Sequence, residues 1–275
     1  MKKSRLPKTF ILSITVINFL FVSFLQSQSI IDAFLIGNNT TILRGTQQDG
    51  LITPRDLDFH KDADRQNELW VINEYNTGSR IHGGSTVTYY NAGQDNQWAE
   101  YRKDSYSGHF MHTASAIAMS ENGTFANTLD CQDANNNANG YFTGCTLWDS
   151  DTTVYARINQ NGPLLGSHID MIHQSPYSEG IASAGGNVYW LFDGFHNAIC
   201  KYDFGAPHEH GGDNHSDGRV WRHSVVAVDR VPGLSSHMEI DPVSGWLYIA
   251  DTGNERILRM DPNSGQIAQN LSPYG

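Results

Sequence analysis

The chain has 275 residues, of which 17% are charged and 26 are glycine, and its formal net charge at pH 7 is −11. This length fits one large domain or two small ones, and many glycines with few charges favour strands and turns over long helices. The negative charge argues against binding to nucleic acid or to an anionic membrane surface.

The first 29 residues have the pattern of a secretory signal peptide. A basic start over 2–8 precedes the apolar run Phe10–Leu25, and small residues at Ser27–Ser29 fit a cleavage site. The run has about 16 residues, fewer than the ~20 that span a bilayer. We therefore predict a signal peptide over 1–29, no membrane insertion after its cleavage, and a secreted protein, either extracellular or periplasmic.

Two sets of short strand patterns follow, with apolar and aromatic residues between turn signals. The first set covers 54–59, 68–73 and 85–90. The second covers 114–119, 123–126 and 153–158, with a long loop inserted over 129–150. Helical periodicity is absent from both sets, which favours an all-β domain.

The chain has three cysteines. Cys131 and Cys145 lie towards the two ends of the inserted loop, and export would place them in an oxidising compartment. We expect a disulfide between them, and a buried free thiol at Cys200 within the strand pattern 197–202. The absence of a Cys-x-x-Cys pair disfavours a cysteine zinc site.

The clearest internal repeat lies near the C-terminus. Residues 187–203 align with 245–261, so that Asp193 falls on Asp251 and Ile199 on Ile257. Each copy reads as strand, tight turn, strand, and a further short strand precedes each one, at 180–184 and 238–241. Together with the two upstream sets of strand patterns, these two copies make four, which recur roughly every 60 residues. This repeat length exceeds the ~40–50 residues of most propeller blades because the copies contain long loops. Four short strands per copy predict β-propeller blades.

The last copy carries a family resemblance. Leu247–Met260 reads LYIADTGNERILRM and is similar to the NHL repeat, whose core is LYVADTGNxRI. The match is weaker in the upstream copies. The resemblance implies an NHL-type β-propeller over 30–275. Such propellers usually have six blades, and the sequence stops at Leu271–Gly275, where another strand would begin. The four visible blades are therefore expected to belong to an incomplete six-bladed ring, truncated at the C-terminus. The alternative is a closed four-bladed ring.

Strand order predicts which loops share a face of the propeller. The loop before the innermost strand and the turn between the second and third strands lie on one face, and the innermost strands lie nearest the central channel. Imidazoles that converge there from several blades are suited to zinc. The alternative is a set of scattered polar loop residues. The candidate ligands of a channel metal are His109, His112, His173, His237 and Asp56.

A second candidate metal site is the histidine-rich loop 207–218, which strand order places on the opposite face. Its carboxylates could suit calcium, and its imidazoles favour zinc. The alternative is a solvated, flexible loop. The candidate ligands are His208, His210, Asp213, His215 and Asp217.

Two functions fit these features, and the usual sequence motifs of hydrolases and nucleotide-binding enzymes are absent. An extracellular propeller most often binds a peptide, glycan or protein through its loops, and we predict such a binding module. Aromatic side chains on the face that carries the candidate channel histidines would contact the ligand. The alternative comes from Ser235–Asp241 followed by Leu247–Asp251, which resembles a blade of the peptidyl-α-hydroxyglycine α-amidating lyases. That resemblance implies a zinc-dependent lyase with His237 as a ligand. The aromatics that the binding-module prediction places on the ligand-binding face are Tyr75, Phe110, Tyr141, Phe142, Trp148 and Phe195.

Overall fold

The computed structural model describes residues 42–223, 225–264 and 269–274. The chain divides into two units at Leu43/Arg44, and every strand described below belongs to the second, Arg44–Gly275. The predicted signal segment 1–29 lies outside the described residues. Within the described part of the chain, no helix is long and apolar enough to cross a membrane.

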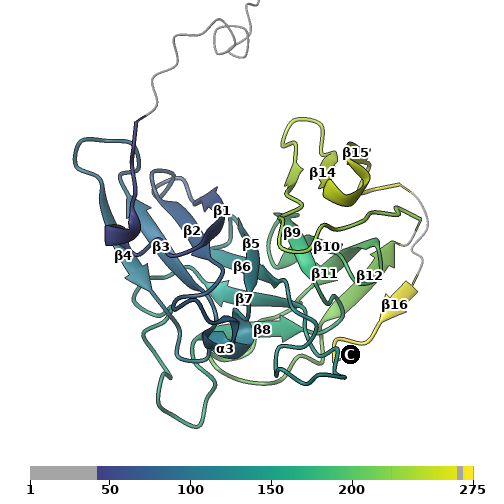
Figure 1. The fold of residues 1–275 in the computed structure, drawn as a ribbon, viewed down its shortest axis with the longest axis horizontal. Coiled ribbons are helices and arrows are strands. Elements are labelled where there is room, and N and C mark those ends of the chain that lie inside the picture. Colours follow the sequence, from purple (N-terminus) through teal and green to yellow (C-terminus); the bar gives the residue numbers. More distant parts are fainter. Residues whose placement is uncertain (1–41, 224, 265–268, 275) are drawn as a thin grey trace, which may run out of the picture. The chain divides into compact units, whose positions relative to one another are not determined.

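The second unit folds into four antiparallel sheets arranged as the blades of a β-propeller, as predicted (Figure 1). Blade 1 contains β1 (Pro54–Phe59), β2 (Leu69–Asn73), β3 (Ser85–Tyr90) and β4 (Trp98–Arg102). Blade 2 contains β5 (Ala114–Met119), β6 (Thr124–Leu129), β7 (Cys145–Asp149) and β8 (His168–Ile172).

Blade 3 contains β9 (Ser178–Ser183), β10 (Val188–Asp193), β11 (Ala198–Asp203), β12 (Arg219–His223) and β16 (Gln269–Leu271). Blade 4 contains β13 (Met238–Ile240), β14 (Leu247–Asp251) and β15 (Arg256–Met260). The first strands of successive blades lie side by side, β1 against β5, β5 against β9, and β9 against β13. The described helices are short: η1 (Gln47–Asp49), η2 (Arg80–His82), α3 (Ser107–Phe110) and η3 (Thr252–Asn254). The all-β prediction is confirmed for these four blades, and a six-bladed ring stays a prediction.

Two strand predictions are wrong. Residues 153–158 form turns, and the outer strands of blade 2 are β7 and β8. The apolar pattern at 153–158 arises because Tyr155 is fully buried in a core while its backbone makes turns. Blade 4 has three strands instead of the four expected, because β16 pairs with β12 of blade 3, Leu271 opposite Val220.

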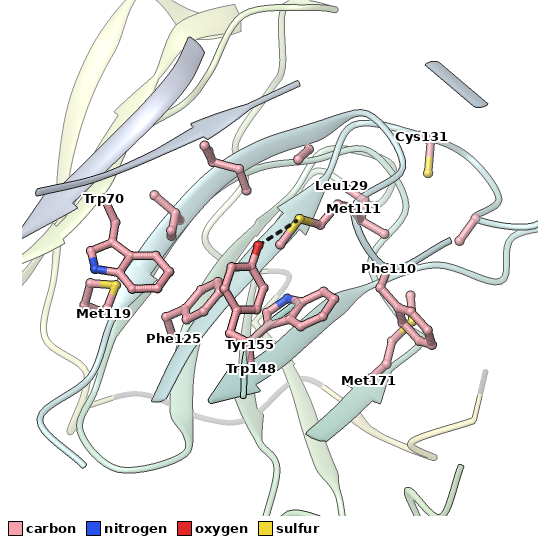
Figure 2. Packing of buried hydrophobic residues seen from close by; sticks show 14 residues of the cluster. Trp70, Phe110, Met111, Met119, Phe125, Leu129, Cys131, Trp148, Tyr155 and Met171 are labelled. Atoms are coloured by element: carbon pink, nitrogen blue, oxygen red, sulfur yellow. Dashed lines mark hydrogen bonds between the residues drawn. The ribbon is translucent and has the colours of Figure 1, made fainter. Parts of the chain in front are cut away.

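Apolar layers between neighbouring blades form the core. The layer between blades 1 and 2 contains Trp70, Phe125, Trp148 and Tyr155, which pack ring against ring (Figure 2). The ring centroids of Trp70 and Phe125 are 5.1 Å apart, and Tyr155 meets Phe125 edge-on at 5.1 Å. The Tyr155 hydroxyl lies 3.8 Å from the sulfur of Met111. Similar layers join blades 2 and 3 and blades 3 and 4.

The three cysteines are free thiols, so the predicted disulfide is wrong. Cys131 belongs to the core between blades 1 and 2, whereas Cys145 belongs to the core between blades 2 and 3. The two side chains therefore serve different layers of the fold. Cys131 Sγ lies 3.5 Å from the hydroxyl of Thr143 instead. Cys200 is buried and free, as predicted.

Candidate ligand and metal site

Five histidines and one aspartate gather at the outer edge of blade 2, and we call this group the histidine cluster. His109 comes from α3, His168 and Asp170 from β8, and His173 from the turn that follows β8. The remaining two belong to the loop 204–218 between β11 and β12 of blade 3. The cluster is His109, His168, Asp170, His173, His208 and His215.

The loop 204–218 reaches the cluster because it runs along the free edge of β8. The backbone N–H of His208 donates to the carbonyl of Ile169 at 3.1 Å, and that of Gly211 donates to the carbonyl of His168 at 2.7 Å. The backbone N–H of His215 donates to the Tyr274 hydroxyl at 2.8 Å. The expectation that the loop lies on the face opposite to His173 is therefore wrong, because its 15 residues are enough to follow the edge of β8.

The cluster is tightly packed. The His215 ring centroid lies 5.2 Å from that of His208 and 5.6 Å from that of His173. Asp170 is fully buried, and its Oδ1 lies 2.7 Å from His215 Nδ1. A carboxylate beside an imidazole in this way fixes the orientation of the ring.

Burial keeps most of these imidazoles neutral. It lowers the pKa of both His168 and His173 to about 3, and lowers the pKa of His109 and His208 as well. A neutral imidazole has a ring nitrogen with a free lone pair, which is the form that binds metals and accepts hydrogen bonds.

Two adjoining pockets open beside the cluster, and together they form what we call the aromatic groove. The pockets measure about 430 Å³ and about 400 Å³, and both are lined by Phe142, His173 and Tyr274. The first is also lined by Tyr141 and Phe195, which expose 52% and 44% of their surface. Every lining residue is described, and none is Lys or Arg.

The sequence located only some of these aromatics correctly. Tyr141, Phe142 and Phe195 are exposed at the groove, as predicted. Trp148 is completely buried in the core between blades 1 and 2, and Phe110 stacks on His168 at a centroid distance of 3.7 Å. Trp148 therefore provides no contact surface, whereas Phe110, although only 3% exposed, lines the second pocket of the groove.

The structure divides the predicted channel ligands. His109 and His173 join the histidine cluster, with ring centroids 6.4 Å apart. His112 is buried, and its Nδ1 bonds the carbonyl of Gly108 at 3.0 Å. His237 pairs with Asp56 instead, 3.5 Å from Nδ1 to Oδ1. Among the described residues, Asp170, His208 and His215 are the one set of three or more potential metal ligands within reach of one another, so the predicted channel ligands do not form such a set.

The predicted loop ligands also separate. His208 and His215 turn into the cluster, whereas His210 lies 3.4 Å from Asp149 Oδ2. Asp217 Oδ2 accepts a hydrogen bond from the backbone N–H of Ala206 and so closes the base of the loop. Asp213 is exposed at the rim of the groove.

The sequence analysis did not find a charged network that joins the innermost strands β1 and β9 to neighbouring loops. Arg55 contacts Glu74 at 3.1 Å and Glu179 at 3.4 Å, and Arg230 contacts Asp130 at 3.1 Å and Glu179 at 3.4 Å. Burial and the neighbouring Asp130 carboxylate raise the pKa of Glu179 to about 9. Glu74 and Asp130 each directly follow the second strand of a blade, near the position of the aligned Asp193 and Asp251, which is the signal that could have found them.

Comparison with known proteins yields no family. No family model matches the sequence, and no curated protein matches it. Solved structures that are similar include an auxiliary nutrient binding protein from Bacteroides ovatus, with 14% identity, a TM-score of 0.49, and coverage of 80% of this chain and 44% of that one.

Two further solved structures are similar at the same level. Hydrazine synthase from Kuenenia stuttgartiensis has 10% identity and a TM-score of 0.44, covering 77% of this chain and 59% of that one. An auxiliary nutrient binding protein from Bacteroides thetaiotaomicron has 13% identity and a TM-score of 0.46, covering 81% and 42%. This chain spans less than two thirds of each, and likeness at this level says nothing about function. The NHL resemblance stays a prediction.

Proposed function

We propose that this protein is an exported binding propeller of the NHL type that holds a small, uncharged ligand in the aromatic groove. The observation that carries the proposal is the pair of adjoining pockets, which share Phe142, His173 and Tyr274 and are flanked by exposed aromatic rings. Ligand sites are typically concave, with aromatic walls and a few polar groups.

The chemistry of the lining narrows the ligand. Tyr141 and Phe195 lie 4.8 Å apart between ring centroids and offer flat apolar faces. Gln174 and His196 add hydrogen-bonding groups in the same pocket. Without Lys or Arg in the lining, and with a net charge of −11, the groove disfavours anions. A sugar ring or the aromatic side chain of a peptide has a suitable flat, uncharged face.

The lyase alternative has less support. It requires His112, His173 and His237 around one ion, and among the described residues these three are not within reach of a common point. The binding function requires no such convergence, because it uses only the groove.

Ligand titration tests the proposal. The purified chain is titrated with a panel of neutral mono- and disaccharides and with N-acetyl amides of tryptophan and tyrosine, followed by saturation-transfer NMR and calorimetry. We expect one of the two classes to bind, and the double variant Tyr141→Ala/Phe195→Ala to bind at least tenfold more weakly. Trp98→Ala, which removes an equally exposed aromatic from blade 1, is the matched control. Binding that is unaffected by the double variant, or lost with the control, would rule out the groove.

A further inference from the structure

Unsatisfied polar atoms concentrate in the histidine cluster. Among the described residues, nine buried side-chain nitrogens and oxygens have no hydrogen-bond partner, and four of them are here. They are Asp170 Oδ2, His208 Nε2, and both ring nitrogens of His173. A buried polar atom without a partner costs about 1–3 kcal/mol, so four such atoms at one place indicate that a ligand completes the site.

The same residues have the arrangement of a metal site. One ligand atom from each of Asp170, His208 and His215 lies within 4.8 Å of the other two. Two ligand atoms on one zinc ion, each at about 2.0–2.2 Å, are at most about 4.4 Å apart, a spacing that this group can reach through small side-chain rotations. His208 is half-buried on a loop, which leaves room for that movement.

From this geometry we infer that Asp170, His208 and His215 bind a divalent transition-metal ion, with zinc as the reference ion. Two imidazoles and one carboxylate suit such ions, whereas calcium requires six or more oxygen ligands. Three protein ligands leave an open coordination position for water. His173, with both ring nitrogens free and its ring beside His215, is placed to hydrogen-bond that water.

This site differs from both sites predicted from the sequence. His208 and His215 belong to the predicted loop set, but their carboxylate partner is Asp170 of β8 and not Asp213 or Asp217. The ion therefore joins blade 2 to the 204–218 loop of blade 3. It goes beyond ligand binding in the aromatic groove, and neither inference depends on the other.

Zinc titration of the full chain tests the inference. After stripping with EDTA, calorimetry with zinc chloride should show one ion per chain, and the thermal unfolding midpoint should rise with zinc because the ion binds the folded state alone. Calcium chloride should produce neither effect.

Two variants of the same loop provide the matched comparison. His208→Gln removes a ligand from a half-buried position, and we expect at least tenfold weaker zinc binding and loss of the midpoint shift. His210→Gln changes a histidine two residues away whose ring faces Asp149, and it should bind zinc as the wild type does. Asp170→Asn should also weaken binding, with its fold checked by circular dichroism.

Three outcomes would overturn the inference. The first is a folded wild-type chain that takes up no stoichiometric zinc. The second is a His208→Gln variant that binds as tightly as the wild type. The third is equal weakening by His208→Gln and His210→Gln, which would place the ion on the loop alone. None of these results affects the titrations with sugars and amides, so the two proposals fail separately.

Discussion

At the scale of single residues, a charge network with more carboxylates than arginines joins the innermost strands β1 and β9 to the segments beside them. Glu74, Asp130 and Glu179 face two arginines, Arg55 and Arg230. Both arginines stabilise carboxylates, but Glu179 is fully buried beside Asp130, and two close carboxylates do not both ionise readily. A proton on Glu179 reduces the repulsion within the network.

This proton makes stability depend on pH. The pKa of Glu179 is raised from 4.5 to about 9, so between these values the folded protein retains a proton that the unfolded chain releases. The free energy of unfolding should therefore fall as pH rises from about 5 to about 9, with a contribution of up to about 1.4 kcal/mol per pH unit. Glu179→Gln should remove this contribution. Urea denaturation of both proteins at several pH values measures the difference, and parallel pH profiles would contradict the prediction.

The cysteines provide a second test at this scale. Burial raises the pKa of the Cys131 thiol to about 12 and raises those of Cys145 and Cys200 as well. Since the thiolate is the reactive form, iodoacetamide should leave the native protein unmodified. In denaturant without reductant, mass spectrometry should find all three cysteines alkylated. Modification of Cys200 alone would instead indicate the Cys131–Cys145 disulfide.

At the scale of elements, neighbouring blades are joined through the edges of their innermost strands. Asp56 Oδ2 of β1 accepts a hydrogen bond from the backbone N–H of Ile117 at 3.0 Å, and Asp58 Oδ2 accepts one from that of Met119 at 2.8 Å. These N–H groups belong to β5, which among the described strands pairs with β6 alone. The two aspartates therefore take the place that a neighbouring strand would otherwise fill.

Removing one of these acceptors should destabilise the junction between blades 1 and 2. We expect Asp58→Ala to lower the free energy of unfolding by about 1–3 kcal/mol, because the N–H of buried Met119 loses its partner. Asp58 also pairs with Lys61 at 3.0 Å, but that pair is partly exposed and contributes little. Lys61→Ala is therefore the control, and chemical denaturation compares the two. Equal losses would assign the effect to the ion pair.

At the scale of the whole molecule, the blades depend on one another for their cores. The rings of Trp70 from blade 1 and of Phe125 and Trp148 from blade 2 pack into one layer with Tyr155 (Figure 2). Each sheet buries a face against the next sheet, so no blade has a complete core by itself.

A truncation inside this layer should weaken the whole unit. Phe125 is fully buried, and Phe125→Ala should cost about 3–5 kcal/mol through lost burial and the cavity left behind. Ile257→Ala, at a side chain that is 72% exposed, should change the free energy of unfolding by less than about 0.5 kcal/mol. Urea unfolding followed by circular dichroism measures both, and similar losses in the two variants would contradict this account of the core.

Elements with local signals could be predicted from the amino-acid sequence. Alternating apolar residues and tight turns correctly predicted β1 to β3 of blade 1 and the aligned hairpins β10–β11 and β14–β15. It missed β7 and β8, because long loops separate them from their partners and hide the repeat. It also could not assign β16 to blade 3, since pairing between distant strands leaves no local pattern.

The candidate site could not be predicted in the same way, because its residues come together only in the folded chain. The sequence singled out His173, His208 and His215 but assigned them to two faces, and it missed Asp170. The reason is the loop 204–218, which leaves its own blade and follows the edge of β8 through backbone hydrogen bonds. Strand order predicts where a short loop must lie, but a long loop goes where its backbone groups find partners.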